Sequence, residues 1–476
     1  MSMAKVTIVW MRQDLRIEDH PALDAAAQRG SVIPLYIWSP QEEGHWPLGG
    51  ASKWWLHHSL KSLENDLRSL GLPLIIRKGK SLDCLRDVIK ETNADAVFWS
   101  RRYEPYAIKR DIQVKSKLSE EGLLAKSFPG NVLYEPWSIQ NKQGKPFQVF
   151  TFFWKNCLAK EQPLAPLSAP IGVKGKIVEV DSLHIEDLKL LPTTSWDEGI
   201  AHTWKPGSVY AKEFLSYFLE GGAHDYNERR DRPDLPGVSR LSPYLHFGEI
   251  SVRMVWDEIV KKLGFQEAEP YLRQLGWRDF AYHLLYHFPK TPEEPLRQEF
   301  AYFPWKENKK LLKVWQKGMT GYPFVDAGMR QLWMTGWMHN RARMVVGSFL
   351  VKDLLLPWQT GAQWFWDTLV DADLANNTLG WQWVAGSGAD AAPYFRIFNP
   401  ITQGEKFDPE GSYVRKWVPE IANLPDKWIH KPWEAPLDVL EKAGVKLGQT
   451  YPYPIVNHDE ARLAALEAFE EIKAAR

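Results

Sequence analysis

Residues 371–400 read DADLANNTLGWQWVAGSGADAAPYFRIFNP. The stretch combines carboxylates, amides, two tryptophans and a glycine-rich turn, a mixture that is unusual for a core segment. Taken singly, these features fit a helix end with a capping Asn, a turn and two core indoles. Together they place hydrogen-bonding groups beside large aromatic surfaces, as a site must do to grip a heterocycle by its edge and stack on its face. We therefore expect a heterocycle-binding site here.

The composition bounds the class of protein. A chain of 476 residues is too long for one ordinary core, so two domains are expected. The 59 Lys and Arg balance the 59 Asp and Glu, which excludes a strongly basic protein but not a local basic groove. With only Cys84 and Cys157, a disulfide framework is not expected and a reducing cytoplasm fits. No signal pattern and no long apolar run occur, so we expect a soluble cytoplasmic protein with no membrane contact.

The first part of the chain alternates strand and helix patterns. Apolar, β-branched runs predict strands at 6–10, 32–38, 74–77 and 96–99. Periodic segments predict helices at 23–28, 53–70 and 82–91. This order predicts an α/β domain with a doubly wound parallel sheet over residues 1–130. Trp10 is followed by Met-Arg-Gln-Asp and not by a glycine-rich turn, so a Rossmann dinucleotide site has no support.

The remaining chain has a different texture. Residues 131–202 lack periodicity, which predicts an interdomain connector. Residues 203–476 predict a larger all-α domain, with helices at 210–221, 249–263, 268–288, 309–317, 325–335, 340–355, 363–369 and 459–475.

Three local groupings carry candidate chemistry. Residues 226–242 are rich in basic side chains and turn residues, and their amides, hydroxyls and Arg240 suit a pyrophosphate, although a solvated basic loop explains the same pattern. Spacing puts Tyr271, Gln274 and Arg278 on one helical face. Asn340, Arg343 and Met344 share another, where a core role for Met344 is the simpler explanation.

The stretch 371–400 resembles the flavin-binding core of the DNA photolyase and cryptochrome family. Motifs at 10–16, 239–243, 320–323 and 335–344 extend the resemblance over nearly the whole chain. Together with residues 133–137, the texture is most similar to bacterial photolyases that resemble plant cryptochromes. The resemblance implies FAD as cofactor and an enzyme that splits cyclobutane pyrimidine dimers by electron transfer from photoexcited reduced FAD to a flipped-out lesion. We expect a monomer whose partner is DNA containing pyrimidine dimers, and no metal site.

The resemblance also assigns roles to individual residues. It implies that FAD is held by Tyr226, Val238, Ser239, Arg240, Leu241, Ser242, Tyr271, Gln274, Arg278, Asn340, Arg343, Asp371, Ala372, Asp373 and Asn377. It implies a pairing of Arg343 with Asp371. The lesion pocket would comprise Gln274, Trp277, Asn340, Met344 and Trp383. DNA would be contacted by Arg230, Gln274, Trp277, Arg278, Asn340, Arg341, Arg396 and Gln403. An electron relay would run through Trp305, Trp358 and Trp381, although packing explains each tryptophan taken alone.

Two positions bear on the activity. Gln274 stands where photolyases of this kind usually carry Glu, and an amide hydrogen-bonds but supplies no proton. Asn377 is the residue type of photolyases, where plant cryptochromes commonly carry Asp, so repair is favoured over signalling. A cryptochrome photoreceptor is the alternative. A (6-4) photolyase ranks lower, because that group carries two histidines where this chain has Asn340 and Met344.

The resemblance further implies a second, antenna chromophore in the first domain. Residues 49–55 and 101–106 are candidates to touch it, although helix-to-sheet packing is the simpler explanation for one of Trp54 and Trp55. Its identity, a folate or a deazaflavin, stays open, because Tyr106 and Ala107 stand where several folate-binding members carry Asn and Glu.

Overall fold

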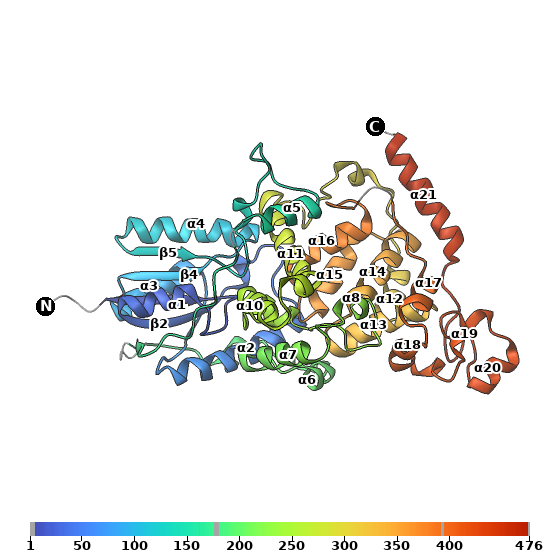
Figure 1. Cartoon of the computed structure of the whole chain (residues 1–476), viewed down its shortest axis with the longest axis horizontal. Helices are drawn as coiled ribbons and strands as arrows, with labels where there is room; N and C mark the ends of the chain where they lie inside the picture. Colours follow the sequence, from blue (N-terminus) through green and yellow to red (C-terminus); the bar gives the residue numbers. More distant parts are fainter. Residues whose placement is uncertain (1–4, 161, 176–179, 392–394, 475–476) are drawn as a thin grey trace. The chain divides into compact units, whose positions relative to one another are not determined.

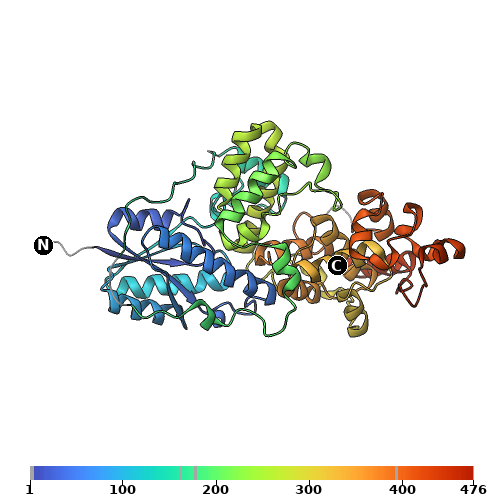
Figure 2. The ribbon, with the colours of Figure 1, turned by 90° about the horizontal axis from the view of Figure 1, so that it is seen from below.

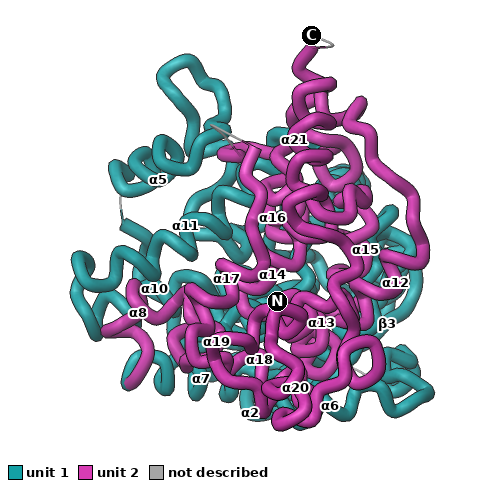
Figure 3. Tube along the Cα trace, turned by 90° about the vertical axis from the view of Figure 1, so that its right-hand side faces the viewer, with its two compact units in different colours: residues 1–220, 239–289, 370–375 teal, residues 221–238, 290–369, 376–476 magenta. Residues whose placement is uncertain are grey.

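The structure is a computed structural model that describes residues 5–160, 162–175, 180–391 and 395–474. It forms two compact units (Figure 3). Unit 1 comprises Met1–Glu220, Ser239–Pro289 and Val370–Ala375, and unit 2 comprises Gly221–Val238, Lys290–Leu369 and Asn376–Arg476. Both units draw on separate stretches of the chain, and the predicted division at residues 130 and 202 stays a prediction.

A parallel sheet organises unit 1. Its strand order is β3-β2-β1-β4-β5, with β6 beside β2. The strands are β1 (Val6–Met11), β2 (Ser31–Trp38), β3 (Ile75–Lys78), β4 (Ala96–Ser100), β5 (Leu124–Phe128) and β6 (Lys174–Gly175). The register places Ile8 between Ile33 and Val97. Because the sheet grows to both sides of β1, the predicted doubly wound α/β fold is confirmed (Figure 2).

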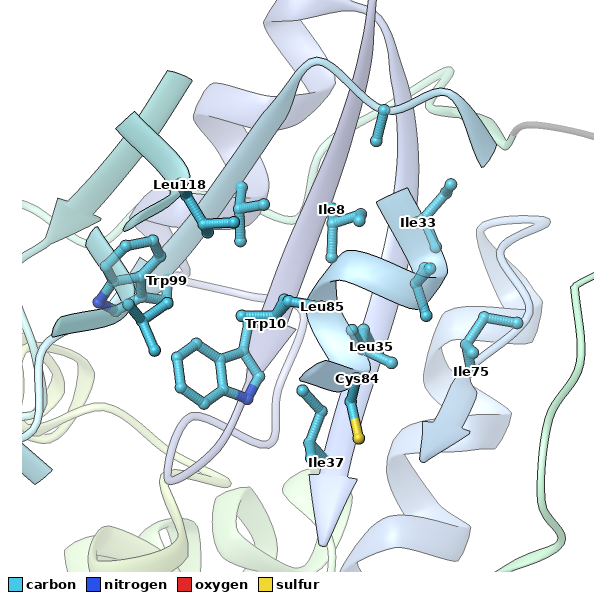
Figure 4. Close-up of a cluster of buried hydrophobic side chains, with 14 of the residues drawn as sticks. Ile8, Trp10, Ile33, Leu35, Ile37, Ile75, Cys84, Leu85, Trp99 and Leu118 are labelled. Atoms are coloured by element: carbon cyan, nitrogen blue, oxygen red, sulfur yellow. The ribbon is translucent and has the colours of Figure 1, made fainter. Parts of the chain in front are cut away.

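A hydrophobic core cluster of unit 1 lies on one face of this sheet (Figure 4). Alternate residues of β1, Ile8 and Trp10, point into it together with Leu35 of β2. Leu85 and Leu118 close the cluster from two helices. The four predicted strands are all present, whereas β5 was not predicted, because its residues are partly exposed and include Lys126 and Ser127.

Unit 1 also contains most of the helices that precede residue 290. They are α1 (Pro21–Arg29), α2 (Gly50–Ser69), α3 (Ser81–Thr92), α4 (Pro105–Glu120), α5 (Phe150–Leu158), α6 (Glu198–Thr203), α7 (Ser208–Glu220), α9 (Ser242–Phe247), α10 (Val252–Leu263) and α11 (Phe265–His287). The interval 131–202 is therefore not wholly irregular, since it contains α5. The sequence signal for α5 is weak because the helix is short, yet Phe150, Phe153 and Trp154 are buried.

Unit 2 is built from helices (Figure 1). They are α8 (Tyr226–Arg229), α12 (Lys309–Gln316), α13 (Pro323–Thr335), α14 (Asn340–Ser348), α15 (Trp358–Thr368), most of α16 (Leu374–Ala385), α17 (Pro400–Phe407), α18 (Ser412–Trp417), α19 (Asp426–Ile429), α20 (Leu437–Ala443) and α21 (His458–Ala474). The predicted last residue of the final helix, Ala475, lies outside the described residues. None of the helices within the described ranges has the length and apolar character needed to cross a bilayer.

Two predictions for unit 2 needed correction. The single helix predicted over 340–355 ends at Ser348 and continues as a π-helical turn, Phe349–Asp353. The turn directs the buried Lys352 to the carbonyl of Ala385, to which its Nζ donates at 3.1 Å. The stretch 371–400 contains a full helix, α16, which the weak helix formers Asn376, Asn377 and Thr378 disguise. Gly386, at φ +86°, ends it.

Candidate functional site

In unit 1, the predicted phosphate-binding turn meets the long helix α11. The Tyr271 hydroxyl donates to Ser239 Oγ at 2.8 Å, so two predicted cofactor residues, distant in sequence, lie together. Arg240 has a left-handed backbone, at φ +55°, and its guanidinium stacks 4.3 Å from the centroid of Trp204. Burial lowers the pKa of Arg240. No motif in the sequence indicated the contact with Trp204.

Asp373 is a buried carboxylate of unit 1 with two side-chain partners. His246 Nδ1 lies 3.3 Å from its Oδ2, and the hydroxyl of Tyr282 donates to the same oxygen. Burial opposes ionisation, but these two partners and the charge of Arg278 hold the pKa of Asp373 well below its usual range. Asp373 is therefore a fixed anion, and His246 Nε2 is buried with no hydrogen-bond partner among the described residues.

Arg278 shares a helical face with Tyr271 in the predicted manner, but its guanidinium turns inward. It donates to the carbonyls of Asn131 and Leu245 and is 9% exposed. We therefore do not propose a direct DNA contact for Arg278. Ala372, Leu241 and Asp371 are also buried.

Gln274 and Trp277 are partly exposed residues of α11. Gln274 Nε2 donates to the carbonyl of Pro270 at 3.3 Å, within the helix. The ring of Trp277 stacks on Phe150 at 3.9 Å between centroids and 11° between planes. Phe150, from α5, thus supports one face of Trp277, a role that the sequence did not suggest.

In unit 2, the first turns of α14 carry three predicted site residues. Asn340 is exposed, and Arg343 and Met344 are partly exposed, so this face does not belong to the core. Arg343 Nε donates to the carbonyl of Met338 at 2.7 Å. Asp371, the predicted partner of Arg343, belongs to unit 1, so their pairing stays a prediction.

Helix α16 of unit 2 presents Asn377, Trp381 and Trp383. Asn377 Nδ2 donates to the carbonyl of Ala362 in α15 at 3.0 Å. Trp383 is partly exposed, with the guanidinium of Arg396 5.4 Å from its ring centroid. Trp381 is buried and packs edge-on to Phe365 at 4.9 Å between centroids.

The three predicted relay tryptophans all lie in unit 2 and differ in burial. Trp381 and Trp358 are 3% and 1% exposed, whereas Trp305 is partly exposed. The ring of Trp305 lies 4.3 Å from that of Phe303. This gradient suits a path from a buried site to the surface, and the relay itself stays a prediction.

A basic pocket in unit 2 is lined by residues of α8, α14 and α17 and of the segments that flank them. We define it by its lining residues Glu228, Asp231, Arg232, Arg341, Arg396, Phe398, Gln403, Lys406 and Phe407. Four cations outnumber two carboxylates, as a phosphate-binding surface requires. Three predicted DNA contacts, Arg341, Arg396 and Gln403, meet here. Arg230 is not part of the lining, and its Nε lies 3.9 Å from Asp231.

Comparison with known proteins decides the family. Residues 271–471 match the FAD binding domain of DNA photolyase, and residues 7–171 match the DNA photolyase domain. A deoxyribodipyrimidine photo-lyase of Agrobacterium fabrum is 48% identical, with 98% of each chain covered. The chain belongs to the photolyase and cryptochrome family.

Other relatives span both branches of this family. Cryptochrome-1 of Arabidopsis thaliana is 42% identical over 98% of this chain and 70% of its own length. The crystal structure of a bacterial class III photolyase from Agrobacterium tumefaciens superposes with a TM-score of 0.96, at 48% identity, covering 100% of this chain and 99% of the other. The resemblance inferred from the motifs is confirmed.

The residues of this photolyase-family chain fit FAD. Unit 1 supplies hydroxyls at Ser239 and Tyr271 that suit phosphate oxygens, and a carboxylate at Asp373 that suits a ring N–H. Tyr226, in unit 2, is 8% exposed, and burial raises its pKa to about 12, so it stays a neutral donor. The orphaned His246 Nε2 marks buried polar capacity that a bound ligand or water satisfies.

A second pocket in unit 1 lies at the carboxyl ends of β1 and β2. Its lining includes Trp10, Tyr36, Trp38, Glu43 and Arg102. Arg102 donates to Glu43 at 2.8 Å. Burial raises the pKa of Glu43, but the charge of Arg102 and this hydrogen bond outweigh burial and hold the pKa below its usual value. Two segments were predicted to touch an antenna. Segment 101–106 contributes Arg102 to the lining, whereas segment 49–55 contributes no residue; only its neighbours Leu48 and Leu56 line the pocket.

Proposed function

We propose that this chain is a light-dependent DNA repair enzyme that splits cyclobutane pyrimidine dimers with FAD as cofactor. One observation supports this function most directly. The exposed first turns of α14 carry both the base-contacting candidates, Asn340 and Met344, and Arg341 of the basic pocket. A single rigid helix therefore aligns lesion contacts with phosphate contacts.

The chain's own residues bind and orient the lesion. Trp277 and Trp383 offer partly exposed rings on which a flipped-out dimer stacks. Each ring is braced, Trp277 by Phe150 and Trp383 by Arg396. Gln274 and Asn340 supply amide donors for the carbonyl oxygens of the bases. Bound FAD supplies the light-driven electron chemistry, and the three tryptophans of unit 2 connect it with the surface.

The assay is loss of dimers from an irradiated oligonucleotide under blue light, with a dark control. We expect repair of cyclobutane dimers and not of (6-4) lesions. A photoreceptor without repair activity predicts no light-dependent loss of either lesion. Repair of (6-4) lesions alone would contradict the assignment.

Gln274→Glu tests how the amide acts. If Gln274 acts by hydrogen-bonding a carbonyl through its NH₂, the variant should raise the repair yield only modestly. The corresponding change in free energy should be smaller than the ~1–3 kcal/mol of a lost buried charge-assisted bond. Lesion preference should not change. A gain beyond that range would show that a protonated carboxyl is needed and that Gln274 limits this enzyme.

The proposal extends to a second chromophore in the unit 1 pocket that Trp10, Tyr36 and Trp38 line. Three aromatic rings with a partly buried Arg–Glu pair suit a flat heteroaromatic ligand with polar edges. The absorption spectrum of purified, denatured protein should show a component besides FAD. We further propose a monomer acting on DNA in the cytoplasm, with sedimentation in the presence and absence of DNA as the test.

A further inference from the structure

Asp231 forms an ion pair with Arg341, a candidate DNA contact of the basic pocket. Asp231 Oδ2 lies 2.9 Å from Arg341 Nη2, and both atoms belong to unit 2. The Arg341 guanidinium also stacks over Phe407, 4.1 Å from the ring centroid. The side chains of Arg341 and Asp231 are 15% and 34% exposed, respectively, so their ion pair faces the pocket opening and is not sealed in the core.

A DNA phosphate needs the same guanidinium fork. Phosphate and carboxylate oxygens bind arginine N–H groups in the same bidentate geometry, so the two anions compete for one face of Arg341. A phosphate that arrives must displace Asp231, or approach it at a few ångströms, where two negative charges repel. The pair therefore weakens every backbone contact made through Arg341.

We propose that Asp231 is a built-in competitor of DNA phosphate at Arg341 and thereby limits how tightly undamaged DNA is held. This inference rests on the proposed function, because it presumes that DNA enters the basic pocket. Phosphate contacts carry no sequence or lesion information, and undamaged sites outnumber lesions enormously. Weakening this common attraction leaves the lesion contacts of Trp277, Trp383 and Asn340 to decide where the protein stays.

The neighbouring charges do not share this role. Arg232 is paired with Asp234 at 2.5 Å, and the Asp234 side chain is only 3% exposed, so that pair is internal to the segment. Arg230 approaches Asp231 no closer than 3.9 Å. Glu228 lines the same pocket but, within the described part of the chain, forms no ion pair with Arg341, whereas Asp231 touches it directly.

Asp231→Asn is the decisive variant, because Asn keeps the size and an acceptor oxygen for Arg341 but loses the charge. With the anions about 6 Å apart near a solvated surface, we expect duplex DNA to bind about three- to tenfold tighter at low salt. The slope of log K against log salt concentration should steepen by up to about 0.9, the value of one extra phosphate neutralised. Both are measured by fluorescence anisotropy with a short undamaged duplex and its dimer-containing counterpart, on the FAD-loaded protein.

Glu228→Gln is the matched control, since it removes one negative charge from the same pocket without touching Arg341. It should tighten binding less than Asp231→Asn. In a double-mutant cycle, Asp231→Asn should tighten binding in an Arg341→Gln background no more than Glu228→Gln does. In a repair assay with excess undamaged DNA as competitor, Asp231→Asn should be inhibited at lower competitor concentration than wild type.

The outcomes separate the two proposals. A wild type that neither binds nor repairs dimer-containing DNA removes the proposed function. If wild type binds DNA and Arg341→Gln weakens that binding, the basic pocket is established as a DNA contact surface. The Asp231→Asn result then tests the competitor role by itself. Unchanged or weaker binding by Asp231→Asn, an equal gain from Glu228→Gln, or the same gain without Arg341 each overturn the competitor role.

Discussion

Gly361→Ala should destabilise the protein by displacing the buried indole of Trp381. A Cβ atom built on Gly361 in α15 would lie 2.1 Å from Cη2 and 2.4 Å from Cζ3 of Trp381, and 2.6 Å from Cδ2 of Leu350. Packed carbon atoms approach to about 3.5–4.0 Å, so the ring must move by more than 1 Å or the helices must separate. Glycine is therefore required at this position for close packing and not for its backbone.

The magnitude follows from two opposing effects. Overpacking a filled core costs about 1–3 kcal/mol, and replacing a mid-helix glycine by alanine recovers about 1 kcal/mol of helix propensity. Because the first obstacle is a rigid ring held by Phe365, we expect the upper part of the range, a net loss of about 1–2 kcal/mol. Gly380→Ala in α16 is the matched control, since its Cβ meets no atom within 4 Å. That control should be neutral or stabilising by up to about 1 kcal/mol.

The assay compares thermal unfolding midpoints of the FAD-loaded variants, because a chain with two compact units need not unfold in a single step. The Gly361→Ala midpoint should fall below wild type and below Gly380→Ala. Photoreduction of the bound flavin should slow only in Gly361→Ala, since only that variant moves Trp381. A Gly361→Ala midpoint at or above that of Gly380→Ala would refute the packing argument.

Two further predictions concern the relay and a buried acid. Trp305→Phe should slow photoreduction of oxidised flavin. Because Trp305 is partly exposed, the substitution should change repair by chemically reduced enzyme by less than about twofold. Loss of that repair would reveal a structural role for Trp305. Glu249, 2% exposed, accepts from Trp55 Nε1 at 3.1 Å, and burial raises its pKa from 4.5 to about 8. A pKa raised in the folded state stabilises below the unfolded value and loses that stabilisation as pH rises through the folded value. Glu249→Gln should therefore gain stability over wild type as pH rises from about 5 to 9, and parallel midpoint curves would contradict this.

The sequence by itself determined the doubly wound sheet and the family. Apolar, β-branched runs such as Val6–Trp10 encode strands locally, and a short strand–helix repeat leaves few topologies. The motifs at 239–243 and 335–344 are contiguous, so a linear reading detects them. Local patterns were less decisive in 371–400, where the weak helix formers Asn376 and Asn377 mask the helix that tertiary contacts stabilise.

Only the tertiary structure decided which groups become partners. Asp373 meets Tyr282 and His246 across sequence separations of 91 and 127 residues, and Trp277 rests on Phe150 across 127 residues. The ion pair of Arg341 with Asp231 joins two segments whose pairing no sequence motif indicates. Such pairings depend on how buried faces pack and on which polar atoms packing leaves to be satisfied, and no local periodicity encodes them. The sequence therefore supplied the candidate residues, whereas the fold determined which of them are braced, which are buried and which are held by a competing charge.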